Sequence, residues 1–548
     1  MKKGTVLSKN QKITLTIDGM TAEGSGVGKY EGMAVFVPQT AEGDEIECTI
    51  VKTGKSFCFG KCEKLITPSP ERIEPDCPIY KRCGGCVYRH MTYREEARIK
   101  QRKVEDAVKR IGGFDLKCEE MLAAADPDRY RNKAQLPCRA DANGKLSLGF
   151  FAQRSHNVVD CVDCLLQPKE FAPIISAFKR FVDETKAEIY NESTNKGRVR
   201  HLYLRRSSLT GKIMVCIVVN GNGLHGEDVL VKMLREASGE IESIIINRNT
   251  EKTNVILGKK CRVVWGSEYL TERICGVDFR ISPLSFLQVN IPQAERLYTR
   301  AAEYAALTGK ETVLDLYCGA GTIGLTMAKN AGRLIGAEIV PEAVENAKEN
   351  AALNGIENAR FIEGDAAVAA ETLKNEGIKP DVVIIDPPRK GCDAELIETI
   401  AQMSPDRVVY VSCDCATLAR DMKIFAEKGY QPQKMTAVDM FPRTSHVETV
   451  VQLSREKADD YIKIDIDVEA LQGNVGAIAS YEDIKAYVLE HSGLKVSSLY
   501  IAQVKEKYGL KERVSYNKPK SENARQPKRP ENKEKAIVEA LKHYGYHI

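Results

Sequence analysis

Apolar and polar residues alternate with a period of two in short stretches near the N-terminus. Ile13–Ile17 alternates in this way, and Val35–Pro38 and Ile46–Lys52 have the composition of two further short strands. Gly24–Gly28 holds three glycines in five residues and predicts a turn. Short strands at this spacing are typical of a five-stranded barrel, an architecture that often binds oligonucleotides. We therefore expect a small β-barrel over about 12–65.

A different pattern, in which strands alternate with helical stretches, runs from about 284 to 453. Five apolar runs predict its strands: Thr312–Leu316, Arg333–Glu338, Arg360–Glu363, Asp381–Asp386 and Arg407–Ser412. Pro341–Asn354 is rich in Ala, Glu, Asn and Lys and predicts a helix that ends at Gly355. This order is typical of an α/β doubly wound parallel sheet, which binds ligands at the carboxyl ends of its strands.

The remaining regions complete a four-part organisation. The central region contains apolar strands such as Lys212–Val219 and Ile241–Asn247 and no recognisable catalytic motif. Near the C-terminus, Tyr481–His491 and Ala536–Tyr544 predict helices, and the polar, Pro-containing stretch 521–534 predicts disorder. We expect a β-barrel over 1–66, a cysteine-rich α+β substrate-holding domain over 67–285, the α/β domain over 286–456 and a partly disordered extension over 457–548.

Composition narrows the class of protein. The 548 residues are 43% hydrophobic and 28% charged, as in soluble globular proteins, and no run of about 18 apolar residues predicts a membrane span. Because Met1–Gly4 lack the apolar core of a signal peptide, we expect a cytoplasmic protein. Its 17 cysteines are then better explained by metal binding or catalysis than by disulfides.

Charge is unevenly distributed along the chain. The net charge is only +4, but residues 80–110 hold ten Lys and Arg against four Asp and Glu, and residues 511–535 hold nine against four. Two basic segments favour a nucleic-acid partner, since phosphate contacts supply most of the sequence-independent affinity for nucleic acid. The alternative is that they are solvated helix surfaces and a soluble tail.

Three cysteines lie close together after the predicted barrel. Cys77, Cys83 and Cys86 have Cys-x5-Cys-x2-Cys spacing, and two glycines before the last let the backbone wrap a metal. A fourth ligand must come from elsewhere, and of the two candidates, Cys161 and Cys164, the second is preferred. Four thiolates suit either a [4Fe–4S] cluster or a structural zinc ion, and spacing does not separate these. Unrelated buried thiols are the weaker alternative.

A glycine-rich loop follows the first strand of the α/β region. The run Gly319–Gly324 satisfies the dinucleotide-binding pattern, so the loop by itself also fits a dehydrogenase. Glu338, at the end of the second strand, could bind the ribose of either NAD or S-adenosylmethionine. The fourth strand ends in Asp386-Pro387-Pro388, whose prolines form a rigid wall beside the ligand crevice. That wall favours a methyltransferase acting on bases over a dehydrogenase.

Two residues near the end of the α/β region could react with a substrate. Cys413 follows a buried strand and is expected at the open edge of the sheet; Cys415 is the competing candidate, and either could be a small buried apolar side chain. Glu448, which leads into a strand over Thr449–Leu453, could be a general base or a solvated acid. His446 is expected to be held by hydrogen bonds rather than to be catalytic. A thiolate and a base suit alkylation of a pyrimidine ring carbon, which is a poor nucleophile until a thiolate adds beside it.

Six ordered motifs together resemble one family: Cys77–Cys86, Ser285–Asn290, Asp315–Gly321, Asp386–Gly391, Ser412–Asp414 and Asp439–Glu448. They resemble the TRAM-containing 23S rRNA (uracil-5-)-methyltransferases, relatives of the tRNA uracil-5-methyltransferases, and the N-terminal stretch resembles the RNA-binding TRAM β-barrel. The resemblance covers about 12–453. It implies methyl transfer from S-adenosylmethionine to carbon 5 of a uridine in RNA, with 23S rRNA as the substrate. We also expect a monomer without membrane contact.

The resemblance assigns roles residue by residue. It implies that Cys413 is the nucleophile that adds to carbon 6 and that Glu448 is the base that removes the carbon-5 proton. It implies a [4Fe–4S] cluster on Cys77, Cys83, Cys86 and Cys164. The positions that match methyl-donor binding are Gln288, Tyr317, Thr322, Glu338, Asp365 and Asp386. Two positions depart from the family: Thr322 stands where some members have asparagine, and Cys415 where proline is frequent.

The substrate assignment leaves alternatives. One is a methyltransferase for another RNA, acting on a tRNA uridine or an RNA cytosine. Another is a non-catalytic RNA-binding or assembly factor, which the intact reactive pair argues against. In each catalytic case the target base must leave its stack to enter the pocket. Arg131, Lys133, Arg205 and Arg206 are candidate phosphate contacts.

Overall fold

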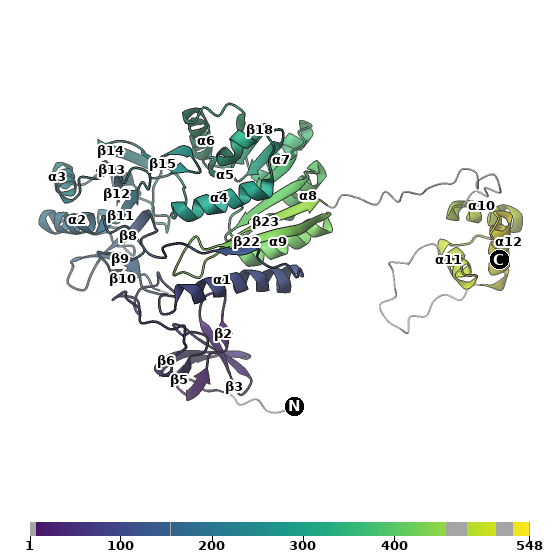
Figure 1. The fold of residues 1–548 in the computed structure, drawn as a ribbon, viewed down its shortest axis with the longest axis horizontal. Coiled ribbons are helices and arrows are strands. Elements are labelled where there is room, and N and C mark those ends of the chain that lie inside the picture. The colour runs from purple at the N-terminus through teal and green to yellow at the C-terminus, as the bar shows by residue number, and fades with distance from the viewer. Residues whose placement is uncertain (1–6, 154, 456–478, 511–529, 547–548) are drawn as a thin grey trace. The chain divides into compact units, whose positions relative to one another are not determined.

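A computed structural model describes residues 7–153, 155–455, 479–510 and 530–546. The chain forms two compact units, Met1–Lys457 and Ala458–Ile548. The described part of the first unit contains three large sheets and a two-stranded hairpin (Figure 1). Within these ranges, no helix has the length and apolar character that crossing a bilayer requires.

The N-terminal β domain is a six-stranded sheet in the order β1-β5-β6-β4-β3-β2. Its strands are β1 (Lys12–Thr16), β2 (Gly19–Met20), β3 (Gly26–Tyr30), β4 (Met33–Val37), β5 (Glu45–Thr53) and β6 (Phe57–Thr67). Every second residue of β1 is buried, as the predicted alternation requires, since successive side chains point to opposite faces. The expectation of five strands was wrong, because the two-residue β2 pairs with β3 and adds a sixth.

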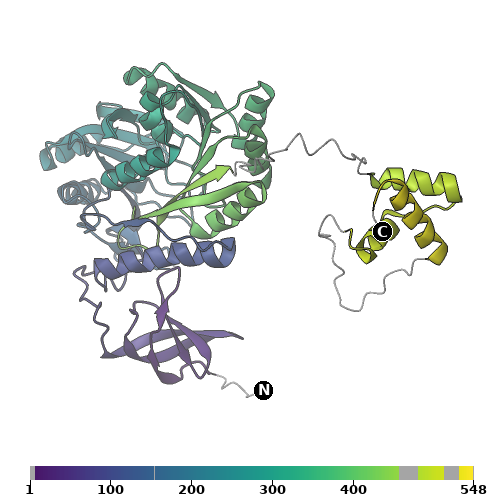
Figure 2. The ribbon, with the colours of Figure 1, turned by 45° about the vertical axis from the view of Figure 1, so that its right-hand side comes forward.

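A long helix follows the cysteine-rich segment. Helix α1 (Tyr93–Ala107) begins at Thr92, whose side chain accepts a hydrogen bond from the N–H of Glu95, and it continues into a π-helical turn, Val108–Gly112. The short strand β7 (Glu120–Leu122) then pairs with β22 of the α/β sheet. Figure 2 shows α1 lying between the N-terminal β domain and that sheet. Thus β7 extends the α/β sheet from a distant part of the sequence, and α1 packs beside it.

The central domain is a seven-stranded sheet in the order β10-β9-β8-β11-β12-β13-β14. Its strands are β8 (Lys133–Ala140), β9 (Leu146–Phe151), β10 (Val158–Asp160), β11 (Val199–Arg206), β12 (Ile213–Val219), β13 (Ile241–Arg248) and β14 (Lys260–Gly266). Helices α2 (Phe171–Thr185) and α3 (Glu227–Ala237) share one apolar core with this sheet. The predicted central strands are confirmed as β12 and β13. A hairpin, β15 (Leu270–Ile274) and β16 (Val277–Ile281), leads to the α/β domain.

The α/β domain is built on an eight-stranded sheet in the order β19-β18-β17-β20-β21-β23-β22-β7. Its strands are β17 (Thr312–Leu316), β18 (Arg333–Glu338), β19 (Ala359–Glu363), β20 (Val382–Ile385), β21 (Arg407–Ser412), β22 (Tyr430–Val438) and β23 (Glu448–Arg455). The first five are parallel, and β23 runs antiparallel to β21. The five predicted strands are confirmed to within a residue at each end.

Helices cover both faces of this sheet. They are α4 (Ile291–Ala305), α5 (Thr322–Met327), α6 (Pro341–Leu353), α7 (Ala366–Asn375), α8 (Ala394–Met403) and α9 (Cys415–Glu427). One apolar core holds residues of α1, α7, α8 and α9, and a second holds residues of α4, α5 and α6. The predicted helix is confirmed as α6, which ends one residue before Asn354. This is the expected doubly wound arrangement.

The C-terminal unit contains three described helices, α10 (Tyr481–Ser492), α11 (Ser498–Lys507) and α12 (Glu531–His543), around one apolar core. The first predicted helix is confirmed as α10, and α11 was not predicted. Helix α12 begins five residues before the predicted start, so the prediction of disorder was wrong for Glu531–Glu534, where Pro530 precedes the first turn. The rest of that prediction, over 521–529, lies outside the described residues.

Candidate active site

The carboxyl ends of four parallel strands bring several predicted site residues to one edge of the α/β sheet. Tyr317 follows β17, Glu338 ends β18, Asp386 follows β20 and Cys413 follows β21. Strands β17 and β20 are neighbours, and the chain leaves them in opposite directions across the sheet. Such a switch point opens a crevice for ligands between the two halves.

The glycine loop turns sharply after β17. Tyr317 has a left-handed backbone (φ 66°), a conformation uncommon for a residue with a Cβ atom. The N–H of Gly324 donates to Asp315 Oδ2 at 2.9 Å, and a Cβ at position 324 would lie 2.7 Å from the same oxygen. Gly324 therefore allows α5 to begin directly against the Asp315 carboxylate.

Asp315 is a buried carboxylate with one unsatisfied oxygen. It is 1% exposed, and its Oδ1 has no hydrogen-bond partner in the protein. Burial, together with the charges of Asp386 and Glu338, raises the pKa of Asp315 to about 7, and the hydrogen bond from the N–H of Gly324 opposes this shift. Three neighbouring carboxylates at a crevice favour a ligand that carries positive charge.

Two carboxylates at this edge are each close to an exposed apolar side chain. Glu338 accepts hydrogen bonds from two loop N–H groups, at 2.9 and 3.1 Å, and Asp365 caps the first turn of α7. Ile339, the residue after Glu338, is 60% exposed. Val368, on the turn of α7 that Asp365 caps, is 63% exposed. Aliphatic side chains beside carboxylates suit a nucleoside, whose base packs on the former while its ribose hydroxyls donate to the latter.

Gln288 and Thr322 are the two remaining predicted methyl-donor residues. Thr322 is the first residue of α5, and its hydroxyl lies 3.5 Å from the hydroxyl of Tyr298. Burial raises the pKa of Tyr298, and the charges of Asp386 and Glu448 raise it further, which places Thr322 in the same neighbourhood. The backbone oxygen of Gln288 accepts a hydrogen bond from Asn132 Nδ2 at 3.3 Å, so this contact fixes its main chain.

The predicted nucleophile and base meet across two antiparallel strands. Ser412 at the end of β21 is paired with Thr449 of β23. Cys413 follows Ser412 and Glu448 precedes Thr449, so the two residues lie opposite each other one position beyond this pair. Cys413 is partly exposed, whereas Glu448 is 5% exposed. This register places a thiol that ligands can reach beside a nearly buried carboxyl group.

The electrostatic environment couples these two residues to Asp386 and Arg389. Burial, together with the charge of Asp386, raises the pKa of Glu448 to about 8, and Arg389 opposes this shift. Burial, together with the charges of Glu448 and Asp386, raises the pKa of Cys413 to about 11, and Arg389 opposes this shift as well. The Arg389 guanidinium is thus the nearby cation that favours both the thiolate and the carboxylate.

Cys415, the competing candidate, points elsewhere. It is the first residue of α9, is 6% exposed and belongs to the apolar core beneath the sheet. Its Sγ lies 3.9 Å from the backbone oxygen of Lys103 on α1. The Asp414 side chain caps α9 by accepting hydrogen bonds from the N–H groups of Ala416 and Thr417. Cys413 therefore stays at the strand end, and Cys415 begins the helix. Cys415 is therefore a core residue.

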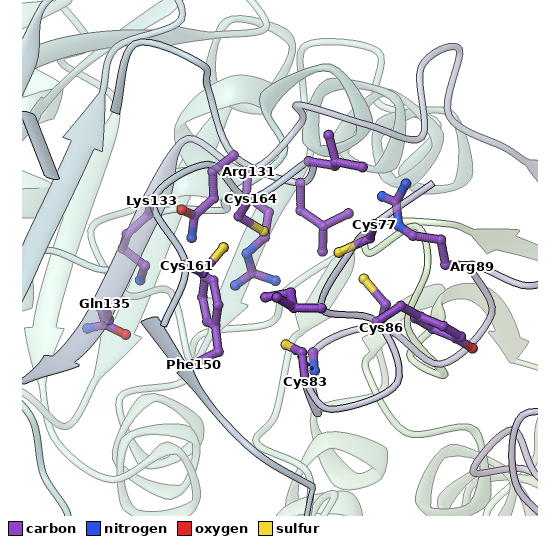
Figure 3. Close-up of a pocket in the computed structure, with 16 residues that line it drawn as sticks. Cys77, Cys83, Cys86, Arg89, Arg131, Lys133, Gln135, Phe150, Cys161 and Cys164 are labelled. Carbon is purple, nitrogen blue, oxygen red and sulfur yellow. Dashed lines mark hydrogen bonds between the residues drawn. The ribbon is translucent and has the colours of Figure 1, made fainter. Parts of the chain in front are cut away.

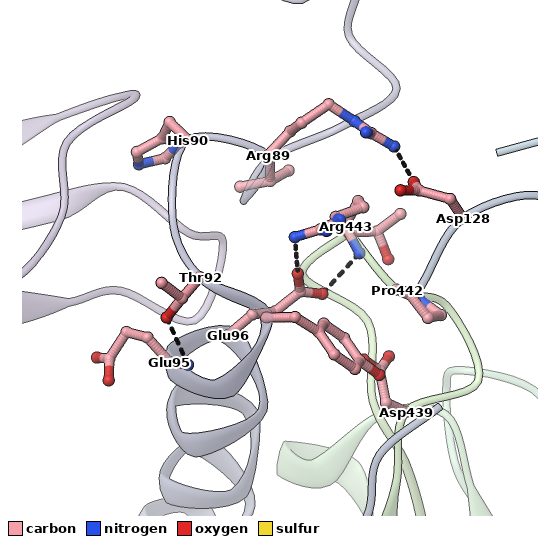
Figure 4. Close-up of polar contacts among 12 residues, drawn as sticks. Arg89, His90, Thr92, Glu95, Glu96, Asp128, Asp439, Pro442 and Arg443 are labelled. Atoms are coloured by element: carbon pink, nitrogen blue, oxygen red, sulfur yellow. Dashed lines mark hydrogen bonds and ion pairs between the residues drawn. The ribbon is translucent and has the colours of Figure 1, made fainter. Parts of the chain in front are cut away.

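The loop that precedes Glu448, residues 439–447, is held by buried ion pairs to α1, and Figure 4 shows the one between Glu96 and Arg443. Lys100 of α1 is fully buried, and its Nζ donates to Glu96 Oε1 and to Asp439 Oδ1, both at 2.7 Å. It also donates to the backbone oxygen of Phe441 at 3.1 Å. The N–H of Arg443 donates to the same Glu96 oxygen at 2.6 Å. Helix α1 thereby holds residues 439–443 of the loop that leads to the predicted base.

The side chains of Tyr130 and Lys103 and the backbone N–H of Val87 bind the carbonyl groups of the same loop. The hydroxyl of Tyr130 donates to Pro442 O at 3.0 Å, and Lys103 Nζ donates to Ser445 O at 2.9 Å. The N–H of Val87, directly after Cys86, donates to Arg443 O at 2.7 Å. The cysteine-rich segment is therefore hydrogen-bonded directly to the loop that leads to the predicted base.

Five cysteines line one cavity of about 290 Å³. They are Cys77, Cys83, Cys86, Cys161 and Cys164, and Figure 3 shows their sulfur atoms turned toward a common space. Arg89, Arg131 and Lys133 also line the cavity. Within the described ranges, no group of three or more His, Cys, Asp or Glu side chains has a geometry that could hold a metal ion.

The chemistry of this donor set fits a metal–thiolate centre. Burial, together with the neighbouring thiols of Cys164 and Cys83, raises the pKa of Cys86 to about 12, and Arg89 opposes this shift. Each buried thiol disfavours ionisation of its neighbours, so the thiolates that ligate metals need added positive charge nearby. A metal centre supplies that charge. The sequence preference for Cys164 over Cys161 stays open, because both line the cavity.

A family profile described as tRNA (Uracil-5-)-methyltransferase matches residues 93–456, more than half of the chain. The chain belongs to this family. A TRAM domain profile matches residues 7–62 of the methyltransferase, which covers the N-terminal β domain. The sequence-based recognition of the family, the TRAM domain and the class I methyltransferase fold is confirmed.

Curated relatives carry general names. An "Uncharacterized RNA methyltransferase" of Clostridium tetani is 44% identical over 454 residues, which covers 83% of this chain and 98% of the relative. One of Halalkalibacterium halodurans is 41% identical and covers 82% of this chain and 99% of its own length. A solved structure of the Pyrococcus abyssi tRNA (uracil-54, C5)-methyltransferase with S-adenosyl-L-homocysteine superposes with a TM-score of 0.65 and 28% identity. It covers 80% of this chain and 99% of that chain.

Sequence reasoning missed several residues that shape the site of this methyltransferase. Asp315 was part of a motif but was given no role, and Ile339 and Val368 carry no signal except their position beside predicted carboxylates. Lys100 could not be distinguished by sequence from the other basic residues of its helix. Arg205 was expected to contact phosphate, but it is 1% exposed and donates to the backbone oxygens of Ser285 and Leu287. That expectation was wrong because the fold uses the guanidinium internally.

Proposed function

We propose that this methyltransferase transfers a methyl group from S-adenosylmethionine to carbon 5 of a uridine in 23S rRNA. The supporting observation is that Cys413 lies opposite Glu448 at the ligand crevice, beside Asp386. Methylation of an exocyclic oxygen or nitrogen needs no thiolate beside the ring, whereas a ring carbon does. Membership of the uracil-5-methyltransferase family and the TRAM domain support an RNA substrate.

The crevice supplies groups for the methyl donor. Glu338 and Asp365 would bind its nucleoside, with Ile339 and Val368 against the base. Asp315 and Asp386 would face its positive charge, and Gln288, Tyr317 and Thr322 would complete the site. When bound there, S-adenosylmethionine supplies an electrophilic methyl group.

The protein residues then act in a fixed order. The Cys413 thiolate forms a bond to carbon 6 of uracil, and the electron pair of the 5,6 double bond makes carbon 5 nucleophilic. Carbon 5 takes the methyl group, and the Glu448 carboxylate removes the proton still attached to that carbon. The freed electron pair restores the double bond as the sulfur–carbon 6 bond breaks and the thiolate leaves.

The pKa values of the pair indicate what must precede attack. With pKa values of about 11 and 8, Cys413 and Glu448 are both largely protonated near neutral pH. Arg389 lowers both pKa values, and a positively charged donor beside Asp386 would oppose the carboxylates that raise them. Binding of the donor therefore favours the reactive thiolate.

We also propose that Cys77, Cys83, Cys86 and Cys164 hold a [4Fe–4S] cluster. Such a centre would cross-link the cysteine-rich segment to the loop that contains Cys164. Because Val87 bonds to the base-carrying loop, this support would extend to Glu448. Structural support is therefore the role that the contacts favour over electron transfer.

The most specific part of the proposal is which RNA serves as the substrate. The cysteine motif and TRAM domain resemble the 23S rRNA enzymes, which supports ribosomal RNA. The Pyrococcus abyssi protein is a tRNA (uracil-54, C5)-methyltransferase, so a tRNA uridine is the second candidate.

Labelling separates these substrates. The full chain would be incubated with methyl-labelled S-adenosylmethionine and with 23S rRNA or tRNA from cells that lack the protein, and the RNA digested to nucleosides. We expect label in 5-methyluridine of 23S rRNA. Label in tRNA alone would move the target, label in 5-methylcytidine would change the base, and no label in any RNA would refute the activity.

A further inference from the structure

The outer face of the TRAM domain carries a cluster of phenylalanine rings. Phe36 of β4 and Phe57 and Phe59 of β6 have ring centroids 5.5, 5.8 and 5.6 Å apart. Their sequence neighbours Val35, Val37 and Cys58 are buried in the core of the domain. The three rings therefore point away from that core, and Phe57 is 40% exposed.

This position is unusual for phenylalanine. The outward face of a small antiparallel sheet is ordinarily polar, since it contacts water. Cross-strand ring pairs stabilise a sheet, but exposed rings gathered on one face also mark a surface that contacts a partner. The domain packs on the rest of the first unit elsewhere, through Ala41 and a core that includes Tyr88, Met91 and Ile99. The phenylalanines are outside that contact.

The strand register places a lysine on each side of the rings. Across one row of the sheet, Lys29 of β3 is opposite Ala34, which is opposite Phe57. In the next row, Phe59 of β6 has Phe36 of β4 opposite it on one side and Lys52 of β5 opposite it on the other. Both lysines are exposed and form no ion pair with a described residue. The rings thus lie between two positive charges on neighbouring strands.

We propose that this phenylalanine face binds single-stranded RNA by stacking unpaired bases on Phe57 and Phe59. Lys29 and Lys52 contact the phosphates on either side. The inference rests on the proposed RNA substrate and adds a binding surface outside the catalytic crevice. A flat aromatic face accepts any base, and the flanking charges match a sugar–phosphate backbone, so this surface anchors an unpaired segment of the substrate. A duplex cannot use it, because its bases are stacked on one another.

The test is RNA binding by the full chain, measured by fluorescence anisotropy. The probes are a labelled oligouridylate of about 12 nucleotides, within the usual site size of such surfaces, and a duplex of equal length. Phe57→Ala/Phe59→Ala should weaken binding of the single strand roughly 5- to 150-fold for each base that no longer stacks, and leave duplex binding unchanged. Ile66→Ala is the matched control, since Ile66 is 46% exposed on the same strand and lies outside the ring cluster.

Salt dependence tests the lysines separately. Lys29→Gln/Lys52→Gln should reduce the slope of log affinity against log salt by about 1.4, which corresponds to two phosphate contacts on a single strand. The phenylalanine variant should leave this slope unchanged. Single-strand binding by Phe57→Ala/Phe59→Ala equal to that of the parent, or an equal loss in Ile66→Ala, would overturn the inference.

Failure of the proposed function has a different signature. A parent protein that binds the oligouridylate through these rings but labels no RNA would leave the surface intact and refute methyl transfer. A parent protein that labels 23S rRNA but binds the oligouridylate equally well without the rings would support methyl transfer and refute the binding surface.

Discussion

Cys413 and Glu448 stand opposite each other one residue beyond the last pair of β21 and β23, Ser412 with Thr449. They are 35 positions apart in the sequence, and the antiparallel hairpin formed by β22 and β23 returns the chain to the end of β21. The proposed nucleophile comes from a parallel strand end and the proposed base from the antiparallel strand beside it. The chemistry of the site therefore depends on one register.

Removing the proposed thiol should abolish methyl transfer. Cys413→Ala leaves no group to activate carbon 5, so incorporation of labelled methyl into RNA should fall to background. Cys415→Ala is the control, because that thiol is buried against α1 on the far side of the strand end. It should keep most of the activity. Loss of activity in the second variant with retention in the first would move the nucleophile to Cys415.

Replacing the base should trap the adduct. Glu448→Gln keeps the shape of the side chain but does not remove the carbon-5 proton, so the bond between Cys413 and carbon 6 cannot be broken by elimination. The variant should form a covalent RNA–protein species that migrates slowly on a denaturing gel. The double variant Cys413→Ala/Glu448→Gln should lack that band. If Glu448→Gln gives no slow species while still binding RNA, another group is the base.

The same substitution should stabilise the protein in alkaline solution. The pKa of Glu448 is about 8 in the folded protein, above its ordinary value of 4.5. Its contribution to stability is therefore complete below about pH 4.5 and is lost as the pH rises through 8. Because glutamine stays neutral, the free energy of unfolding of Glu448→Gln should exceed that of the parent by a margin that grows across this range. Above it the margin should be constant, on the order of a few kcal/mol.

Denaturant unfolding at several pH values measures this margin. Glu349→Gln, on the exposed side of α6, serves as the control and should show no growth with pH. An equal margin for Glu448→Gln at pH 5 and pH 9 would contradict the raised pKa of Glu448.

Lys100 should be essential to the fold around the base. Lys100→Met leaves Glu96 and Asp439 buried without their shared cation, which ordinarily costs about 3–5 kcal/mol of stability. Lys348→Met is the control, because Lys348 pairs with Glu345 in water on α6 and its loss should change stability by less than about 1 kcal/mol.

A triple variant, Lys100→Met/Glu96→Gln/Asp439→Asn, tests the charge argument. It neutralises the two acids that lose their lysine in Lys100→Met and should recover part of the lost free energy of unfolding, less the contribution of the ion pair between Glu96 and Arg443 at 3.6 Å. Failure of that recovery, together with a loss in Lys100→Met no larger than in the control, would show that the network does not hold the loop.

The cysteine cavity should bind iron. Protein purified without oxygen should be brown and contain about four irons and four sulfides per chain, as a [4Fe–4S] cluster requires. Cys86→Ala should lose most of this iron, whereas Cys261→Ala, an exposed cysteine of β14 outside the cavity, should keep it. One zinc per chain with no sulfide would identify a structural zinc site instead.

Much of this molecule was predictable from local pattern. Five apolar runs located β17 to β21 to within a residue, because buried parallel strands are nearly continuous in apolar residues. The positions of Glu338, Asp386 and Cys413 followed from that, since ligands bind where such strands end. The helical start of α12 was missed because Pro, Asn and charged residues look polar, although Pro and acidic residues are favoured in a first helical turn.

The sequence by itself determined the strands, the residues at their ends and the chemistry available there, because these depend on neighbours along the chain. Tertiary structure alone buried Cys415 at the start of α9 and left Cys413 partly exposed. It also turned a basic stretch into internal support: Lys100 binds Asp439, which is 339 positions away. No local pattern contains such a pair, because a lysine in a basic helix is ordinarily solvated unless the fold brings buried carboxylates to it.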